Sequence, residues 1–281
     1  MTPTRTLAPL ALTSFLALAS LAAPAQAADT ASAEAASPHT LTGNLALVTD
    51  YRFRGISQSW RQPAVQGGID YTHASGLYLG NWNSSVSSNS YNNGASLEMD
   101  FYGGYRFEAA REWTTDLGVL HYRYPGAQLN SAPATPTSAS YDNTEIYAGI
   151  SHGPFSAKLS YAVSDYFGLN GRTAAYAYWS ALPDRGGSKG TTYLDLNYTV
   201  DLGQQLTLGL HFGHTAVRNY GELSYSDYKL SLNKEWQGLT LSLALVGTNA
   251  DTAYYQAGNS AGQDPKKLGR TGAVLSLSKS F

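Results

Sequence analysis

The chain of 281 residues has no cysteine, and only 14% of its residues are charged. The absence of cysteine excludes disulfide bonds, thiolate nucleophiles and metal sites built on cysteine ligands. A charged fraction well below the roughly 25% of ordinary domains argues against a typical soluble surface. The formal net charge of -2 provides no basic face of the kind that nucleic-acid binding requires. We therefore expect no nucleic-acid partner.

Long apolar runs are absent from most of the chain as well. After residue 40, no stretch reaches the roughly 18 consecutive apolar residues that indicate a membrane-spanning helix. Near the start, Arg5 is followed by an apolar stretch at 7–21 and then by Ala-Gln-Ala at 25–27. This order is typical of a secretory signal peptide with an A-x-A cleavage site. An uncleaved membrane anchor is the alternative, but Pro9 interrupts an apolar core that is already short.

The chain is therefore expected to have three parts. Residues 1–27 are predicted to be a signal peptide that is cleaved after Ala27. Residues 28–39 are rich in Ala and Ser and have little to bury, which predicts a disordered lead-in. Residues 40–281 remain for the folded domain.

The folded part shows a recurrent alternation of apolar and polar residues. In the clearest example, 239–249, leucine occupies every second position at the start, and Thr, Ser or Ala lies between. A period of two indicates a β-strand whose two faces meet different surroundings. Segments of about ten residues have the length of a tilted strand that crosses a membrane. The predicted strands are 41–51, 63–72, 77–84, 95–107, 113–124, 143–152, 155–167, 191–202, 206–215, 226–236, 239–249 and 269–281.

The connections between these strands alternate strictly between short and long. This alternation is typical of an outer-membrane β-barrel, with short turns on the periplasmic side and long loops outside. We predict an all-β, transmembrane antiparallel barrel of about 12 strands, closed because an open sheet edge cannot be satisfied in lipid. The short turns are 73–76, 108–112, 153–154, 203–205 and 237–238, and the long loops are 55–62, 83–94, 125–142, 168–190, 216–225 and 250–268.

Aromatic residues gather near the ends of the predicted strands. Such positions are typical of the aromatic girdles that flank the apolar band of a membrane barrel. The residues expected to form these girdles are Tyr51, Tyr71, Tyr102, Trp113, Tyr122, Tyr124, Tyr161, Tyr166, Tyr198 and Trp236.

Several segments also resemble a known family. These are TDYRFRGISQS at 49–59, PAVQGGIDY at 63–71, GLYLGNW at 76–82, LEMD with GGY at 97–105, and SLSKSF at 276–281. They resemble the TorF-type porin family of proteobacteria, most densely over the first third of the chain after the signal peptide. The resemblance implies an outer-membrane barrel exported through a cleaved signal, and it implies little about the solute.

Arg52 and Arg54 share parity with Asp50, opposite Leu45 and Leu47, so we expect them in the lumen near the outer mouth. One interpretation is a basic constriction that selects or orients anionic solutes. The other is a network of ion pairs, which we favour because an unpaired buried charge is costly. The partners expected in that network are Asp70, Glu98 or Asp100.

The same parity rule gives a wider set of pore or lumen residues. They are Asp50, Arg52, Arg54, Asp70, Glu98, Asp100, Asp116, Glu145, Lys158, Asp195 and Lys229, seven acids against four bases. The interior is therefore mixed, with a slight acidic excess. The loop 168–190 carries Arg172, Arg185 and Lys189, and its inward folding would add basic charge at the mouth.

Catalytic and metal sites are not expected. His211 and His214 have opposite parity on one strand, and the six histidines show no clustered ligand spacing. A barrel hydrolase would need a Ser, a His and an orienting Asn or Asp within hydrogen-bond reach. His121 and His214 fall on the outward parity, and the spacing singles out no serine partner.

These patterns favour a porin-like channel in the bacterial outer membrane. It would pass small polar solutes or ions passively, without a cofactor, with membrane lipid as its surroundings. A structural or adhesive barrel with a sealed lumen is the main alternative, because about twelve strands lie between filled eight-stranded barrels and open sixteen-stranded porins. A barrel hydrolase is less favoured. The solute and the oligomeric state are not specified by the sequence.

Overall fold

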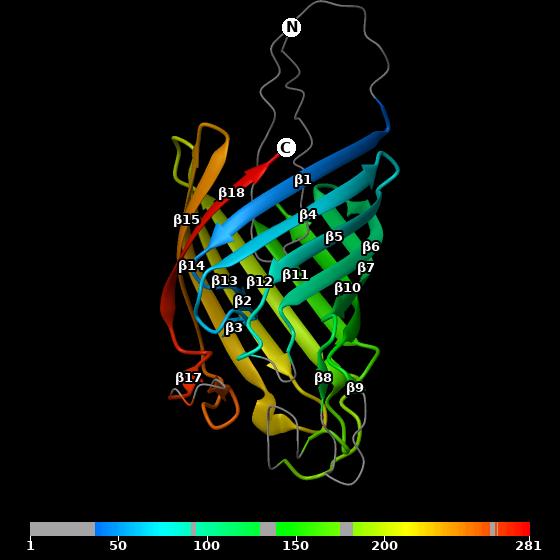
Figure 1. The fold of residues 1–281 in the computed structure, drawn as a ribbon. Coiled ribbons are helices and arrows are strands. Elements are labelled where there is room, and N and C mark those ends of the chain that lie inside the picture. The colour runs from blue at the N-terminus through cyan, green and yellow to red at the C-terminus, as the bar shows by residue number, and fades with distance from the viewer. Residues whose placement is uncertain (1–36, 91–93, 130–138, 175–181, 259–261, 263) are drawn as a thin grey trace, which may run out of the picture.

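The computed structural model describes residues 37–90, 94–129, 139–174, 182–258, 262 and 264–281. Twelve strands of this part of the chain close into an antiparallel barrel (Figure 1). The first wall strand, β1 (His39–Val48), pairs with β4 (Ala64–His73) on one side and with β18 (Gly272–Ser280) on the other. The predicted signal peptide lies outside the described residues.

Sequential wall strands pair with each other around the rest of the ring. These strands are β5 (Leu77–Ser85), β6 (Leu97–Ala110), β7 (Trp113–Arg123), β10 (Asn143–His152), β11 (Phe155–Ala162), β12 (Thr192–Asp201), β13 (Leu206–Ala216), β14 (Tyr225–Trp236) and β15 (Leu239–Thr248). The short elements inside the loops are β2 (Arg52–Phe53), β3 (Ile56–Ser57), β8 (Gln128–Leu129), β9 (Ala139–Ser140), β16 (Gln256–Ala257), β17 (Lys266–Lys267), η1 (Tyr166–Gly168) and η2 (Gly221–Leu223).

The predicted barrel and its twelve strands are confirmed, as is the alternation of short turns with long loops. Two predicted strands extend too far. β1 ends at Val48 rather than at 51, and β11 ends at Ala162 rather than at 167. In both places the chain leaves the wall and packs inside the barrel. Alternation therefore continues in the sequence beyond the end of the strand.

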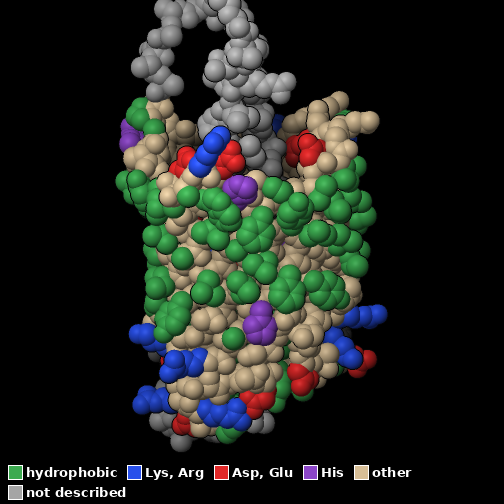
Figure 2. Space-filling model, turned by 180° about the vertical axis from the view of Figure 1, so that it is seen from behind, with side chains coloured by type: hydrophobic (Ala, Val, Ile, Leu, Met, Phe, Trp, Pro, Cys, Tyr) green, Lys and Arg blue, Asp and Glu red, His purple; other side chains and the backbone are tan. Residues whose placement is uncertain are grey.

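Hydrophobic side chains cover the outside of the wall. Leu241, Leu243 and Leu245 on β15 are 43%, 50% and 47% exposed, whereas Ala244, which lies between the last two, is buried. Figure 2 shows such side chains as a band around the middle of one side of the molecule, with charged side chains towards both ends. An apolar band on a closed barrel is the surface that a bilayer requires.

No helix of the described residues is both long and apolar enough to cross a membrane.

The aromatic residues divide between the two sides of the wall. Trp113, Tyr161, Tyr198 and Trp236 are 38–53% exposed on the outside, as predicted for a girdle. Tyr71 has the same outward parity, whereas Tyr102 faces inward and donates to Asp70. The girdle prediction is wrong for four buried residues, which are Tyr51, Tyr122, Tyr124 and Tyr166.

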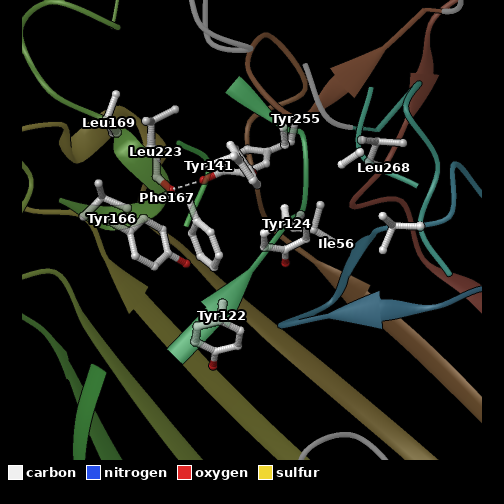
Figure 3. Close-up of a cluster of buried hydrophobic side chains, with 14 of the residues drawn as sticks. Ile56, Tyr122, Tyr124, Tyr141, Tyr166, Phe167, Leu169, Leu223, Tyr255 and Leu268 are labelled. Carbon is white, nitrogen blue, oxygen red and sulfur yellow. Dashed lines mark hydrogen bonds between the residues drawn. The ribbon is translucent and has the colours of Figure 1, made fainter. Parts of the chain in front are cut away.

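The buried aromatic residues form a cluster around Phe167, which we call the aromatic plug. Its other members are Phe53, Tyr122, Tyr124, Tyr141 and Tyr166, whose ring centroids lie 4.7–6.0 Å from that of Phe167. Figure 3 shows rings from the wall and from the loops converging on this residue. Phe167 adopts a positive φ of 48°, which a bulky residue rarely does. Its burial among five aromatic rings holds this conformation in place.

The plug divides the lumen into two halves. In the half beside the long loops (the loop half), inward side chains are buried, as for Gln66, Ser84 and Glu145 at 2%, 1% and 2% exposure. In the half beside the short turns (the turn half), inward side chains such as Asp116 and Asn233 are only half-buried. Charged and amide side chains on the inner face are therefore packed more tightly in the loop half than in the turn half.

Candidate functional site

The lumen is the candidate site, and all the predicted lumen residues lie inside the barrel. Asp50, Arg52 and Arg54 sit in the loop between β1 and β4, and the others occupy inward positions of wall strands. These residues differ in how far their side chains are buried. Those of the loop half are buried, namely Asp50, Arg52, Arg54, Glu98, Asp100 and Glu145. Of the remainder, Asp195 is 7% exposed, and Asp70, Asp116, Lys158 and Lys229 are half-buried.

Arg54 connects the hairpin formed by β2 and β3 to the far wall. Its Nη2 donates to both carboxylate oxygens of Glu145 on β10, at 2.9 and 2.7 Å, and its Nη1 donates to the hydroxyl of Tyr166. The guanidinium carbon lies 4.1 Å from the ring centre of Tyr193. The two charged side chains are only 5% and 2% exposed. A buried, bidentate pair of this kind fixes the position of the hairpin across the lumen.

Arg52 attaches the hairpin to a neighbouring loop. Its Nε lies 2.6 Å from the carboxylate of Asp50, and its Nη1 donates to the carbonyl oxygens of Gly55, Leu268 and Arg270 at 3.0, 2.8 and 3.1 Å. The hairpin is thus joined to the loop between β15 and β18.

Both arginines are in ion pairs, as the favoured interpretation predicted, but the predicted partners were wrong. The partners are Asp50 and Glu145 instead of Asp70, Glu98 or Asp100. The arginines project from a folded loop rather than from an extension of β1. Strand parity therefore could not indicate which carboxylate each would meet.

In the turn half, Arg106 and Asp116 form a pair across neighbouring strands. Arg106 Nε lies 3.1 Å from Asp116 Oδ2, and its guanidinium carbon lies 4.1 Å from the ring centre of Tyr78. The Tyr78 hydroxyl donates to Asp116 and also contacts the hydroxyl of Tyr147. These side chains form a polar strip on β5, β6, β7 and β10.

Close packing positions Tyr78 of this strip and, on β12, Tyr193. A Cβ atom at Gly104 would collide with Tyr78, and one at Gly213 would collide with Tyr193. Glycine at each position lets the ring lie flat against the neighbouring strand. The hydroxyls then reach carboxylates further along the wall, those of Asp116 and Asp227.

A second polar cluster lies on β12, β13 and β14. His211 Nε2 is 2.8 Å from Asp227 Oδ1, and Nδ1 is 2.9 Å from Asn197 Oδ1 and 3.2 Å from Asp195 Oδ1. Donation from both ring nitrogens requires the imidazolium form. Lys229 pairs in register with His211 from β14. This cluster holds both signs of charge at the boundary between the two halves.

Arg106, His211 and Asp227 are charged lumen residues that the predicted set does not contain. Each occupies an inward position of a correctly predicted strand, so the same alternation could have found them. Among the described residues, no three His, Asp or Glu side chains are arranged to hold a metal ion.

The described residues of the loop 168–190 do not bring its basic side chains into the lumen. Arg172 and Lys189 are exposed, and Arg185 donates to Glu222 at 2.6 Å on the outside of the loops. That hydrogen bond lowers the pKa of Glu222 below its ordinary value. Phe167, which directly precedes this loop, is buried in the barrel, as is the apolar Leu169 within it.

The loop half is closed by side chains in the described part of the chain. A cavity of about 40 Å³ remains there, lined by Phe53, Phe167, Tyr141, Tyr225 and other residues. Its volume is close to that of one or two water molecules in the liquid, about 30 Å³ each. The turn half therefore ends at the plug.

Comparison with known proteins identifies the family of this chain. Residues 32–281 match a family described as "Bacterial protein of unknown function (Gcw_chp)". The chain belongs to the Gcw_chp family. The match spans the whole barrel of this Gcw_chp protein, and the TorF-type resemblance stays a prediction. Comparison with curated proteins finds no match.

Solved structures similar to this Gcw_chp chain are also barrels. The KdgM porin in complex with disordered oligogalacturonate is 10% identical, with a TM-score of 0.48 over 86% of this chain and 99% of that one. The NanC porin is 7% identical, with a TM-score of 0.46 over 85% and 98%. The COG4313 outer membrane channel from Pseudomonas putida F1 is 14% identical, with a TM-score of 0.42 over 91% and 100%. Similarity at this level concerns architecture alone, so function has to be argued from the lumen.

Proposed function

We propose that this protein is a porin-like channel of the bacterial outer membrane, of the TorF type. It passes small polar solutes or ions passively, without a cofactor and without catalysing a reaction. The observation that carries the proposal is the turn half of the lumen, where charged side chains are half-buried instead of packed. Arg106, Asp116 and Lys158 represent this group.

Charged groups in the middle of a membrane protein need water or a partner. Lys158 has no ion pair among the described residues, and Asp70 is held there by a single hydrogen bond, from the hydroxyl of Tyr102 at 2.6 Å. Water in the turn half supplies the remaining solvation. A water-filled compartment that is open at one end of a transmembrane barrel is half of a solute pathway.

The other half is closed by the hairpin and the aromatic plug. Arg54 and Glu145 hold the hairpin against the far wall. Passage therefore requires the loop 49–63 to move, and the Arg54–Glu145 pair is the contact that has to break. Acids and bases alternate along the pathway below it, so we expect only mild ion selectivity.

The aromatic plug also favours a second candidate function, a structural barrel with a sealed lumen. Five rings pack around Phe167, and such packing is typical of a permanent core. The two candidates differ in whether the plug ever opens.

Single-channel recording in planar bilayers distinguishes them. The refolded parent protein is expected to show brief, rare openings, and Glu145→Gln should raise the open probability because it removes the charge that holds Arg54. Asp70→Asn, which removes a carboxylate outside the plug, should leave the open probability unchanged. A sealed barrel would give silent bilayers for all three proteins while each migrates as a folded barrel on unheated gels.

Export has its own test. We propose that residues 1–27 are a signal peptide, so the protein purified from outer membranes should begin at Ala28 by mass spectrometry. An intact N-terminus beginning at Met1 would contradict this part of the proposal.

A further inference from the structure

We propose that the loop half of the lumen contains a binding site for a divalent cation, best suited to Ca²⁺. Its protein ligands are the carboxylates of Glu98 and Asp100 on β6 and the side-chain carbonyl of Gln66 on β4. The inference goes beyond the proposed channel and does not depend on transport.

Unsatisfied oxygen atoms are the first observation. Glu98 and Asp100 are both 0% exposed, and Gln66 is 2% exposed. Within the described part of the chain, both oxygens of Asp100, Glu98 Oε2 and Gln66 Oε1 have no hydrogen-bond partner. A buried acceptor without a partner costs free energy, and the cost is larger for a charged group. These acceptors lie on β4 and β6, the two strands that flank β5.

Strand register brings these acceptors to one place. Gln66 pairs with Ser84 on β5, and Ser84 pairs with Glu98 on β6, so these three form one row on the inward face. Asp100 lies two residues further along β6 and therefore faces the same side. Gln66 Nε2 donates to Ser84 Oγ at 3.2 Å, which leaves its carbonyl oxygen for another partner.

Charge is the second observation. The two buried arginines of the loop half are already neutralised, Arg52 by Asp50 and Arg54 by Glu145. Glu98 Oε1 accepts a hydrogen bond from the hydroxyl of Tyr51 at 2.8 Å, and no ion pair of the described residues involves Glu98 or Asp100. Ionised together, these two carboxylates would carry a charge of -2 that no ion pair of the described residues balances, and a divalent cation would balance it.

The chemistry of the ligands selects the ion. Two carboxylates and an amide carbonyl are hard oxygen ligands, which suit Ca²⁺ and Mg²⁺. Ca²⁺ tolerates irregular geometry with six to eight oxygens, including water, whereas Mg²⁺ requires nearly ideal octahedral geometry. The site differs from clusters of three acidic or histidine ligands because one of its three protein ligands is a neutral amide.

A bound ion would also stabilise the closed loop. Tyr51 belongs to the segment between β1 and the hairpin, and its hydroxyl is attached to Glu98. Fixing the Glu98 carboxylate on an ion therefore fixes the start of that segment against β6. We expect Ca²⁺ to raise the melting temperature of the protein and chelation to lower it.

Equilibrium dialysis with Ca²⁺ alone tests the site on full-length mature protein refolded in detergent and treated with a chelator. We expect one ion per chain, with Mg²⁺ binding more weakly. Glu98→Gln and Asp100→Asn should each weaken binding by about tenfold or more. Asp70→Asn is the matched control, because it removes an inward carboxylate from the turn half, and it should bind Ca²⁺ as the parent does.

Two results would overturn the proposal. One is a folded parent protein that binds no Ca²⁺, with a melting temperature that rises on acidification, because protons would then neutralise the carboxylates. The other is Ca²⁺ binding that survives in Glu98→Gln with Asp100→Asn. Heat-modifiable gel mobility verifies that each variant is folded. Gln66→Lys supplies an internal cation, so it should fold and be insensitive to both Ca²⁺ and chelator; a Ca²⁺ response like that of the parent would also contradict the site.

Discussion

The loop half and the turn half of the lumen share one wall but differ in what fills them. In the loop half, Arg54 and Glu145 form an ion pair whose side chains are 5% and 2% exposed. In the turn half, the side chains of Arg106 and Asp116 are 19% and 18% exposed at an ion-pair distance of 3.1 Å. The same strands therefore surround a dry, packed compartment and a wetter, polar one.

The difference shows that the wall of the barrel and the packing of its lumen are determined by different parts of the chain. Alternation along each strand decides which side chains face lipid and which face inward. Whether the inward side chains meet water or a core depends on the loops. Here the loops insert Phe53 and Phe167 at one end only.

The largest expected difference between the halves is in their ion pairs. Arg54→Ala leaves Glu145 buried without its partner and should lower the free energy of unfolding by about 3–5 kcal/mol. Arg106→Ala leaves Asp116 within reach of water and should cost about 1 kcal/mol or less. Urea unfolding of the refolded proteins measures both values. Equal losses would show that the two halves are equally hydrated.

The wall itself provides the next test. Leu243→Arg places a charge on the lipid face and should cost about 2–4 kcal/mol near the middle of the bilayer. Ser242→Arg, one residue away, points into the turn half and should cost much less. Refolding into lipid vesicles at several urea concentrations gives the two values. Similar losses would contradict a wall with a lipid face and a water face.

Two tyrosines that donate to carboxylates, one in each half, test how far water reaches into the lumen, and the expected effects are smaller. The Tyr51 hydroxyl donates to Glu98 in the loop half, and the Tyr102 hydroxyl donates to Asp70 in the turn half. Tyr51→Phe should cost about 1.5–3 kcal/mol, because water does not reach the buried carboxylate to replace the lost hydroxyl. Tyr102→Phe should cost about 1 kcal/mol or less, because water can replace the hydroxyl. Equal costs, again from urea unfolding, would argue against a dry loop half.

The smallest effect is expected outside the lumen, at the pair of Arg185 and Glu222. The hydrogen bond from Arg185 lowers the pKa of Glu222, so its contribution to stability is present above the unfolded pKa, about 4.3, and is lost as pH falls through the lower folded value. The pair is largely exposed, so the contribution is small. The melting temperature of Glu222→Gln should be slightly below that of the parent at neutral pH, and the two should converge at acidic pH. A difference that persists there would show that Glu222 acts through another contact.

The wall was predictable from the sequence, because each strand carries its own period of two. The twelve strands and the order of turns and loops follow from that local pattern. The prediction of strand ends failed where the alternation of apolar and polar residues continues beyond the end of the strand. Tyr51 and Tyr166 follow the ends of β1 and β11 and look like girdle residues, but both are buried inside.

The partners in the lumen were less predictable, because they depend on contacts between distant parts of the chain. Arg54 and Glu145 are separated by 91 residues and meet only because the loop folds across the barrel. Asp227 is a different case. It lies two residues before Lys229 on the inward face, so it could have been found from the sequence.

The most direct test of a dry loop half above a wet turn half uses the absence of cysteine from the chain. Single cysteines are introduced at Ser242, which is half-buried in the turn half, and at Ser84, which is 1% exposed in the loop half. A membrane-impermeant thiol reagent is then applied to each side of oriented, reconstituted protein. We predict that Ser242→Cys reacts from the turn side only and that Ser84→Cys reacts from neither side. Equally fast labelling of Ser242→Cys from the loop side, or ready labelling of Ser84→Cys, would contradict the account.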